Sequence, residues 1–164
     1  MQSEIKVGQQ VVSFDEEATK RLYVETMAIA GADACDCASC RNFAAQRNSV
    51  YSDDFVSLLK RLSVNPLVEL VAFDYDFDIK QPRHLYGGWF PFCGELLEGA
   101  DWRPEHDAGA SEWWFTESFP SFGISAEKRV CAVEFLVEVP WTIPEKSAVA
   151  HRSRPPVVDK SRYR

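Results

Sequence analysis

The stretch that decides the fold spans residues 52–79 and has the sequence SDDFVSLLKRLSVNPLVELVAFDYDFDI. Its first half predicts a helix, because four apolar residues recur at the spacing that places them on one helix face. These residues are Phe55, Leu58, Leu59 and Leu62. Ser52 fits the N-cap position of this helix. Asn65-Pro66 ends it, since a proline disfavours the helical conformation in the residue before it.

The second half of the stretch, residues 67–79, predicts a strand whose side chains alternate between two faces. One face is apolar along its length, with Glu69 as its only interruption, and therefore predicts burial. Its apolar members are Leu67, Val71, Phe73, Tyr75, Phe77 and Ile79. The other face begins apolar and ends with Asp74, Asp76 and Asp78. We interpret these carboxylates as a solvated sheet edge, with a site for a hard cation as the alternative.

Weaker patterns on both sides of this stretch complete the fold prediction. Upstream, residues 22–27 are rich in β-formers and predict a strand, and residues 42–48 permit a helix. Downstream, alternation predicts three further strands, over residues 84–94, 112–119 and 131–139. Gly87-Gly88 predicts a bulge or kink in the first of them. The order predicts an α+β fold, in which a helix pair (about 41–63) packs on one face of a twisted, mainly antiparallel sheet.

The charge is distributed unevenly along the 164 residues, whose net charge is −7. Residues 145–164 carry six Lys and Arg against two acidic residues, a net +4, so residues 1–144 carry −11. We expect a single globular domain over residues 1–144 and a disordered basic tail after it. An acidic body repels phosphate backbones, so we expect no nucleic-acid binding by the body.

Features that would direct the chain to a membrane or to an oxidising compartment are missing from the sequence. No apolar run approaches the roughly 20 residues of a membrane helix, and the N-terminus has no signal-peptide pattern. The number of cysteines, five, is odd, which argues against a pure disulfide framework. These observations predict a cytoplasmic protein without a membrane partner.

A cluster of three cysteines, Cys35, Cys37 and Cys40, is the most chemically specific motif in the chain. Closely spaced thiolates are ligands that zinc prefers, and they need little loop closure to meet at one ion. We therefore predict a zinc site at this cluster. The candidates for a fourth ligand are Cys93, His106 and His84, with Asp36 as a weaker local one. Cys131 lies on an alternating apolar strand and is predicted to be buried.

The same cluster allows two other interpretations. Cys37-Ala38-Ser39-Cys40 is a CxxC unit at the start of a predicted helix, where one thiol can acquire a low pKa and act in redox chemistry. The thioredoxin arrangement also needs alternating βαβ elements, and the antiparallel strands predicted here fit it poorly. In the third interpretation the three cysteines stay reduced and only pack a tight turn.

Aromatic residues make up 13% of the chain and gather around the glycine pair. His84, Tyr86 and Trp89 are candidate ligand-binding residues, because a histidine and a tyrosine there could hold an anion over the Gly87-Gly88 backbone. The common hydrolase, nucleotide and zinc-protease motifs are absent from the sequence. A metal-free protein whose acidic, aromatic surface binds a protein partner, as an adaptor or an immunity protein does, is therefore a further hypothesis.

Two sequence blocks resemble those of a group of uncharacterised bacterial proteins of similar size. They are CDCASCRNF at residues 35–43 and HLYGGW at residues 84–89. The resemblance covers about a third of the chain in pieces and implies a bacterial cytosolic setting and no known activity. It also suggests that the two blocks belong to one site. We therefore expect a binding or scaffold protein rather than an enzyme.

Overall fold

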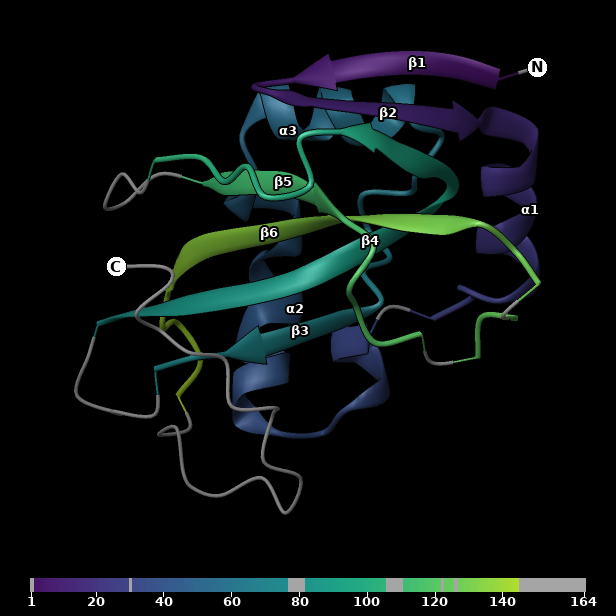
Figure 1. The fold of residues 1–164 in the computed structure, drawn as a ribbon. Coiled ribbons are helices and arrows are strands. Elements are labelled where there is room, and N and C mark those ends of the chain that lie inside the picture. Colours follow the sequence, from purple (N-terminus) through teal and green to yellow (C-terminus); the bar gives the residue numbers. More distant parts are fainter. Residues whose placement is uncertain are drawn as a thin grey trace.

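The computed structural model describes residues 2–29, 31–76, 82–105, 111–121, 123–125 and 127–144. In chain order its elements are β1 (Gln2–Val7), β2 (Gln10–Asp15), α1 (Glu16–Glu25), the 3₁₀ helix η1 (Gly31–Ala34), α2 (Ala38–Val50), α3 (Asp53–Arg61), β3 (Val71–Asp74), β4 (Arg83–Glu98), β5 (Glu112–Thr116) and β6 (Val130–Pro140). The strands form one antiparallel sheet, and α2 and α3 lie behind it in Figure 1. The predicted α+β fold is confirmed.

The long strand β4, of 16 residues, organises the sheet. The strand order is β1-β2-β4-β6-β5, and β3 also pairs with β4. The pairing of β4 with β6 ends at Cys93, and its pairing with β2 begins at Gly94. The first part of β4 therefore pairs with β3 and β6, and its last part pairs with β2.

The side chain of Gln10 links β2 to β5, the last strand in this order. Its Nε2 donates to the Phe115 carbonyl at 2.8 Å, and its Oε1 accepts from the Phe115 N–H at 2.6 Å. The side chain of Gln10 is fully buried. The amide thus occupies the place of a backbone partner between β2 and β5, and it holds the sheet in a curl that remains open.

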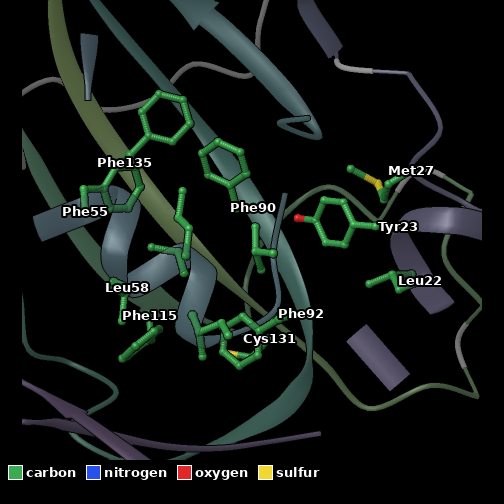
Figure 2. Close-up of a cluster of buried hydrophobic side chains, with 14 of the residues drawn as sticks. Leu22, Tyr23, Met27, Phe55, Leu58, Phe90, Phe92, Phe115, Cys131 and Phe135 are labelled. Carbon is green, nitrogen blue, oxygen red and sulfur yellow. The ribbon is translucent and has the colours of Figure 1, made fainter. Parts of the chain in front are cut away.

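The main core lies between the curled sheet and the helices. Figure 2 shows Phe90 of β4 and Phe135 of β6 gathered with Phe55 of α3. Other members are Leu22, Tyr23, Met27, Leu58, Phe92, Phe115 and Cys131. Cys131 is 0% exposed, which confirms its predicted burial. A smaller cluster of Tyr75, Trp114 and Leu136 forms separately, so the aromatic excess serves two apolar clusters.

The strand predicted over residues 22–27 is wrong, because helix α1 extends through this segment to Glu25. Asp15 caps this helix by accepting from the Ala18 N–H at 2.8 Å, and the Thr19 hydroxyl donates to the Asp15 carbonyl. The buried Thr19, Leu22 and Tyr23 share one helix face. This packed face outweighs the strand propensity of the segment. By contrast, the prediction for α3 is confirmed, because the Ser52 hydroxyl accepts from the Phe55 N–H.

The predicted strand at 67–79 is shortened to β3, and Phe77, Asp78 and Ile79 lie outside the described residues. The predicted bulge at Gly87-Gly88 is wrong, because the β4 register runs unbroken through both glycines against β3 and β6. The glycines instead make room, since a Cβ at Gly87 would meet the Tyr75 ring. The predicted disordered tail at 145–164 also lies outside the described residues. None of the described helices is long and apolar enough to cross a membrane.

Candidate metal centre

The three clustered cysteines converge at the N-terminus of α2. Cys37 is the N-cap residue, and its Sγ accepts from the Cys40 N–H at 3.2 Å. Cys35 directly follows η1, and Cys40 lies in the first turn of α2. The three Sγ atoms all lie within 4.8 Å of one another. The structure therefore brings together three sequence-predicted ligands as a group that could hold a metal ion.

The three thiols differ in their electrostatics. Burial raises the pKa of Cys37 and, more strongly, that of Cys40, and the neighbouring thiols raise the pKa of Cys40 further. Burial also acts to raise the pKa of Cys35, but hydrogen bonds from the Cys37 backbone and from the Cys37 and Cys40 thiols outweigh it and lower that pKa overall. The lowered pKa thus falls on Cys35, outside the CxxC unit. A cation would be needed to hold all three sulfurs as thiolates.

A buried ion pair holds the chain on the N-terminal side of the cysteines. Glu69 is 0% exposed, and its carboxylate accepts two bonds from the Arg47 guanidinium, at 2.8 and 2.9 Å. Glu69 also accepts hydrogen bonds from the first two residues of η1. Its backbone carbonyl accepts from the Gly31 N–H at 2.7 Å, and its Oε1 accepts from the Ala32 N–H at 2.9 Å. Asp33 adds a longer contact to Arg47, at 3.3 Å. Glu69 therefore fixes η1 against α2.

A second anchor holds the cysteine segment from the sheet side, through Ser39. Its hydroxyl donates to Asp74 Oδ2 of β3 at 2.9 Å. The Tyr86 hydroxyl of β4 donates to the Ser39 carbonyl at 2.8 Å. Because Ser39 lies between Cys37 and Cys40, both contacts fix the backbone that carries these thiols. The two sequence blocks that the resemblance singled out thus lie together in space.

Behind Ser39, Asp74 pairs with His84 in the interior. His84 Nδ1 lies 2.7 Å from Asp74 Oδ2, and the His84 side chain is fully buried. Burial raises the pKa of Asp74, although the bonds from His84 and Ser39 act against this rise. The His84 ring packs 4.8 Å from the Trp141 ring, and its Nε2 has no hydrogen-bond partner among the residues that the structure describes. His84 is thus placed to orient Asp74 rather than to reach an external ligand.

The other predicted site residues lie apart from this centre. Cys93 is on β4, where its N–H donates to the Thr19 hydroxyl at 3.0 Å. It follows His84 by nine positions, about 30 Å along an extended strand, and does not join the cysteine group. His106 lies outside the described residues. The predicted ligand-binding residues Tyr86 and Trp89 are 1% and 5% exposed, so both belong to the interior.

Three residues that organise the centre were not predicted from the sequence: Ser39, Arg47 and Glu69. Glu69 did carry a signal, as the only charge on an otherwise apolar strand face. Such a residue needs a buried partner, but the sequence does not say which cation supplies it. Ser39 carried no signal of its own, because its partners come from β3 and β4, distant in the chain.

Comparison with known proteins adds no further constraint on the site. No protein-family model, curated protein or solved structure matches this chain.

Proposed function

We propose that this protein binds one zinc ion through the Sγ atoms of Cys35, Cys37 and Cys40, and that it serves as a binding or scaffold protein rather than as an enzyme. The observation that carries this proposal is the approach of the three Sγ atoms to within 4.8 Å of one another. Zinc–sulfur bonds of about 2.3 Å at tetrahedral angles place sulfurs about 3.8 Å apart. Side-chain rotations that bring the sulfurs closer by about 1 Å would therefore complete the geometry.

The chemistry of the donors favours zinc over harder cations. Thiolates select zinc and other soft or borderline metals, whereas magnesium and calcium prefer oxygen ligands. The positive dipole end at the N-terminus of α2 favours the thiolate forms of Cys37 and Cys40, and so acts against the rise in their pKa that burial causes. Among the described residues, the group supplies three ligands. Asp36, exposed within the same loop, is the nearest protein group in sequence that could complete the tetrahedron.

The surroundings of the centre support a fastening role. The Glu69 anchor lies before the cysteines and the Ser39 anchor lies among them, so Cys35 and Cys37 lie in the segment between the two anchors. A zinc ion bound there would cross-link the end of η1 to the first turn of α2. The polar side chains behind the centre, those of Asp74 and His84, are 7% and 0% exposed and face each other, which suits a support and not a reaction site.

Elemental analysis of protein purified without a histidine tag tests the proposal, with free thiols counted in denaturant on the same sample. We expect about one zinc per chain, and all five cysteines to react as thiols after chelation. The Cys37→Ser variant should lose the zinc. Cys93→Ala is the matched control, because Cys93 lies outside the group, and it should keep the zinc.

Other results would replace the proposal. A metal-free protein with five reactive thiols would show that the three clustered cysteines only pack a tight turn. A metal-free protein with a Cys37–Cys40 disulfide of cytosolic reduction potential would assign a thiol-redox function instead. Metal-free protein that captures a basic protein partner, equally well after Cys→Ser substitution, would favour the protein-interaction function.

A further inference from the structure

A cavity of about 290 Å³ lies at the point where β4 changes partners. The β4–β6 pairing ends with Cys93 opposite Val130, and the β2–β4 pairing begins with Phe14 opposite Gly94. Just beyond Phe14, at Asp15, β2 gives way to α1. Figure 1 shows β2 running into α1 at the right-hand side, where β6 also begins. Two neighbouring strands thus stop beside the same residues of β4, which leaves the hollow.

The floor of the cavity is rigid and weakly polar. Cys93, Gly94 and Ala18 line it. The Cys93 N–H donates to the Thr19 hydroxyl at 3.0 Å, which fixes α1 on β4. A Cβ at Gly94 would collide with the Ser13 carbonyl, so the strands approach closely there. These two contacts hold α1 and β2 against β4 around the floor.

The rim of the cavity carries more positive than negative groups, although the chain as a whole is acidic. Three basic residues, Arg21, Lys128 and Arg129, face two acidic ones, Asp15 and Glu95. This balance contrasts with the net charge of −7 for the chain. An anion is therefore attracted to this part of the surface more than to the rest of the body.

The two rim carboxylates already have partners. Asp15 caps α1, and the bond from the Ala18 N–H lowers its pKa. Glu95 accepts from Arg129 at 2.9 Å. Among the residues that the structure describes, the Lys128 ammonium has one ion-pair contact, a long one of 3.6 Å to Glu25 at the surface.

Arg21 forms no ion pair within the described part of the chain, so Arg21 and Lys128 have capacity left for a ligand. Burial and, to a smaller extent, the charge of Asp15 raise the pKa of the Cys93 thiol, and the charges of Lys128 and Arg21 act against this rise. Both charges therefore reach the floor of the cavity.

We propose that this cavity binds a small oxyanion, the carboxylate or phosphate group of a small molecule, with Arg21 and Lys128 as its charged partners. The neutral Cys93 thiol packs beneath the anion and offers a weak S–H donor. The volume suits a compact metabolite-sized molecule and is too small for a folded partner. The site does not rest on the zinc proposal, because it shares no residue with the cysteine centre.

Titrations with inorganic phosphate and, separately, with succinate test this site at constant ionic strength. The amide resonances of Ala18 and Gly94 are followed by ¹H–¹⁵N NMR, together with the alkylation rate of Cys93 by mass spectrometry. With at least one of the two anions we expect saturable shifts at these amides and slower alkylation. The anion that saturates tells a phosphate ligand from a carboxylate ligand.

The variants Arg21→Gln and Lys128→Gln, singly and combined, keep long polar side chains at exposed positions. The double variant should bind the anion at least 10-fold more weakly, since each hydrogen bond to a charged group contributes roughly a factor of ten or more. Lys60→Gln, on the exposed end of α3, is the control and should leave the affinity unchanged. Linear shifts without saturation for both anions, or equal affinity in the double variant and the control, would overturn the proposal.

Discussion

Replacing Glu69 with glutamine should destabilise the protein strongly, because it removes the charge that neutralises a buried arginine. The Glu69 side chain is 0% exposed, and that of Arg47 is 10% exposed. The two bonds between them, at 2.8 and 2.9 Å, form a bidentate pair. Glutamine preserves the volume and can still accept from the Ala32 N–H. The substitution therefore isolates the loss of charge from any cavity.

The expected cost follows from the burial of Arg47. Removing one partner of a buried ion pair costs about 3–5 kcal/mol, because the remaining charge is left in a poorly solvating interior. Asp33 lies 3.3 Å from the Arg47 guanidinium and is half exposed, so it continues to offset part of that charge. We therefore take the lower end, about 3 kcal/mol. For a chain of this size, each kcal/mol lowers Tm by about 2–4 °C, so we expect a fall of about 6–12 °C.

Urea unfolding followed by circular dichroism measures the effect, and a double-mutant cycle supplies its control. Arg47→Met in the Glu69→Gln background removes the stranded charge while glutamine still accepts from the Ala32 N–H. This double variant should recover most of the lost stability. The reasoning fails if Glu69→Gln costs less than about 1 kcal/mol, or if the double variant is no more stable than Glu69→Gln.

Three further predictions concern the thiols and their support. Asp74→Asn should lower the zinc affinity by about 10-fold, since it weakens the hydrogen bond that the Ser39 hydroxyl donates to residue 74. Competition with a chromophoric chelator measures the affinity, and a change below 2-fold would contradict the role of Asp74 as an anchor. In metal-free protein, Cys35 should react with iodoacetamide before Cys40, because its pKa is lowered and that of Cys40 is raised; peptide mapping that finds Cys40 alkylated first would refute this order. Burial raises the pKa of Cys131 from 9.0 to about 12, so its stabilising contribution is complete below about pH 9 and is lost as the pH rises toward 12. Over that window the unfolding free energy should fall more steeply in the wild type than in Cys131→Ala, by up to about 1.4 kcal/mol per pH unit, and equal slopes would contradict the assignment.

The elements that sequence reasoning predicted well are those in which local and long-range preferences agree. In α3, the Ser52 cap, the acidic first turn and the apolar stripe all favour a helix that also packs. Helix α1 was missed because residues 22–27 favour a strand locally, while the packing of Leu22 and Tyr23 favours a helix. Val24, a strong strand former, is 80% exposed there, so its preference had little packing energy behind it.

The site was predictable where its residues are neighbours in the chain. The proximity of Cys35, Cys37 and Cys40 follows from their spacing, and the structure confirms it. The partners of Ser39 lie on β3 and β4, 35 and 47 positions away, and their approach depends on the sheet register. Glu69, the partner of Arg47, lies 22 positions away in the segment just before β3. For Cys93 the sequence was misleading. Its residue type suggested a metal ligand, but its register places it far along β4 from His84 and Tyr86, which lie near the cysteine centre.

The position of the two anchors decides what a bound zinc ion contributes to the fold. In small zinc domains the metal-free chain is unfolded, because the metal supplies most of the folding energy. Here the main core forms without any contribution from the cysteine centre beyond the partly buried Cys40, and Glu69 and Ser39 already fix both sides of the loop. Protein contacts therefore offset much of the conformational entropy that the cysteine loop loses on ordering, before the metal binds. Zinc should then raise stability by mass action on a folded chain, and chelation should release the metal without unfolding the sheet.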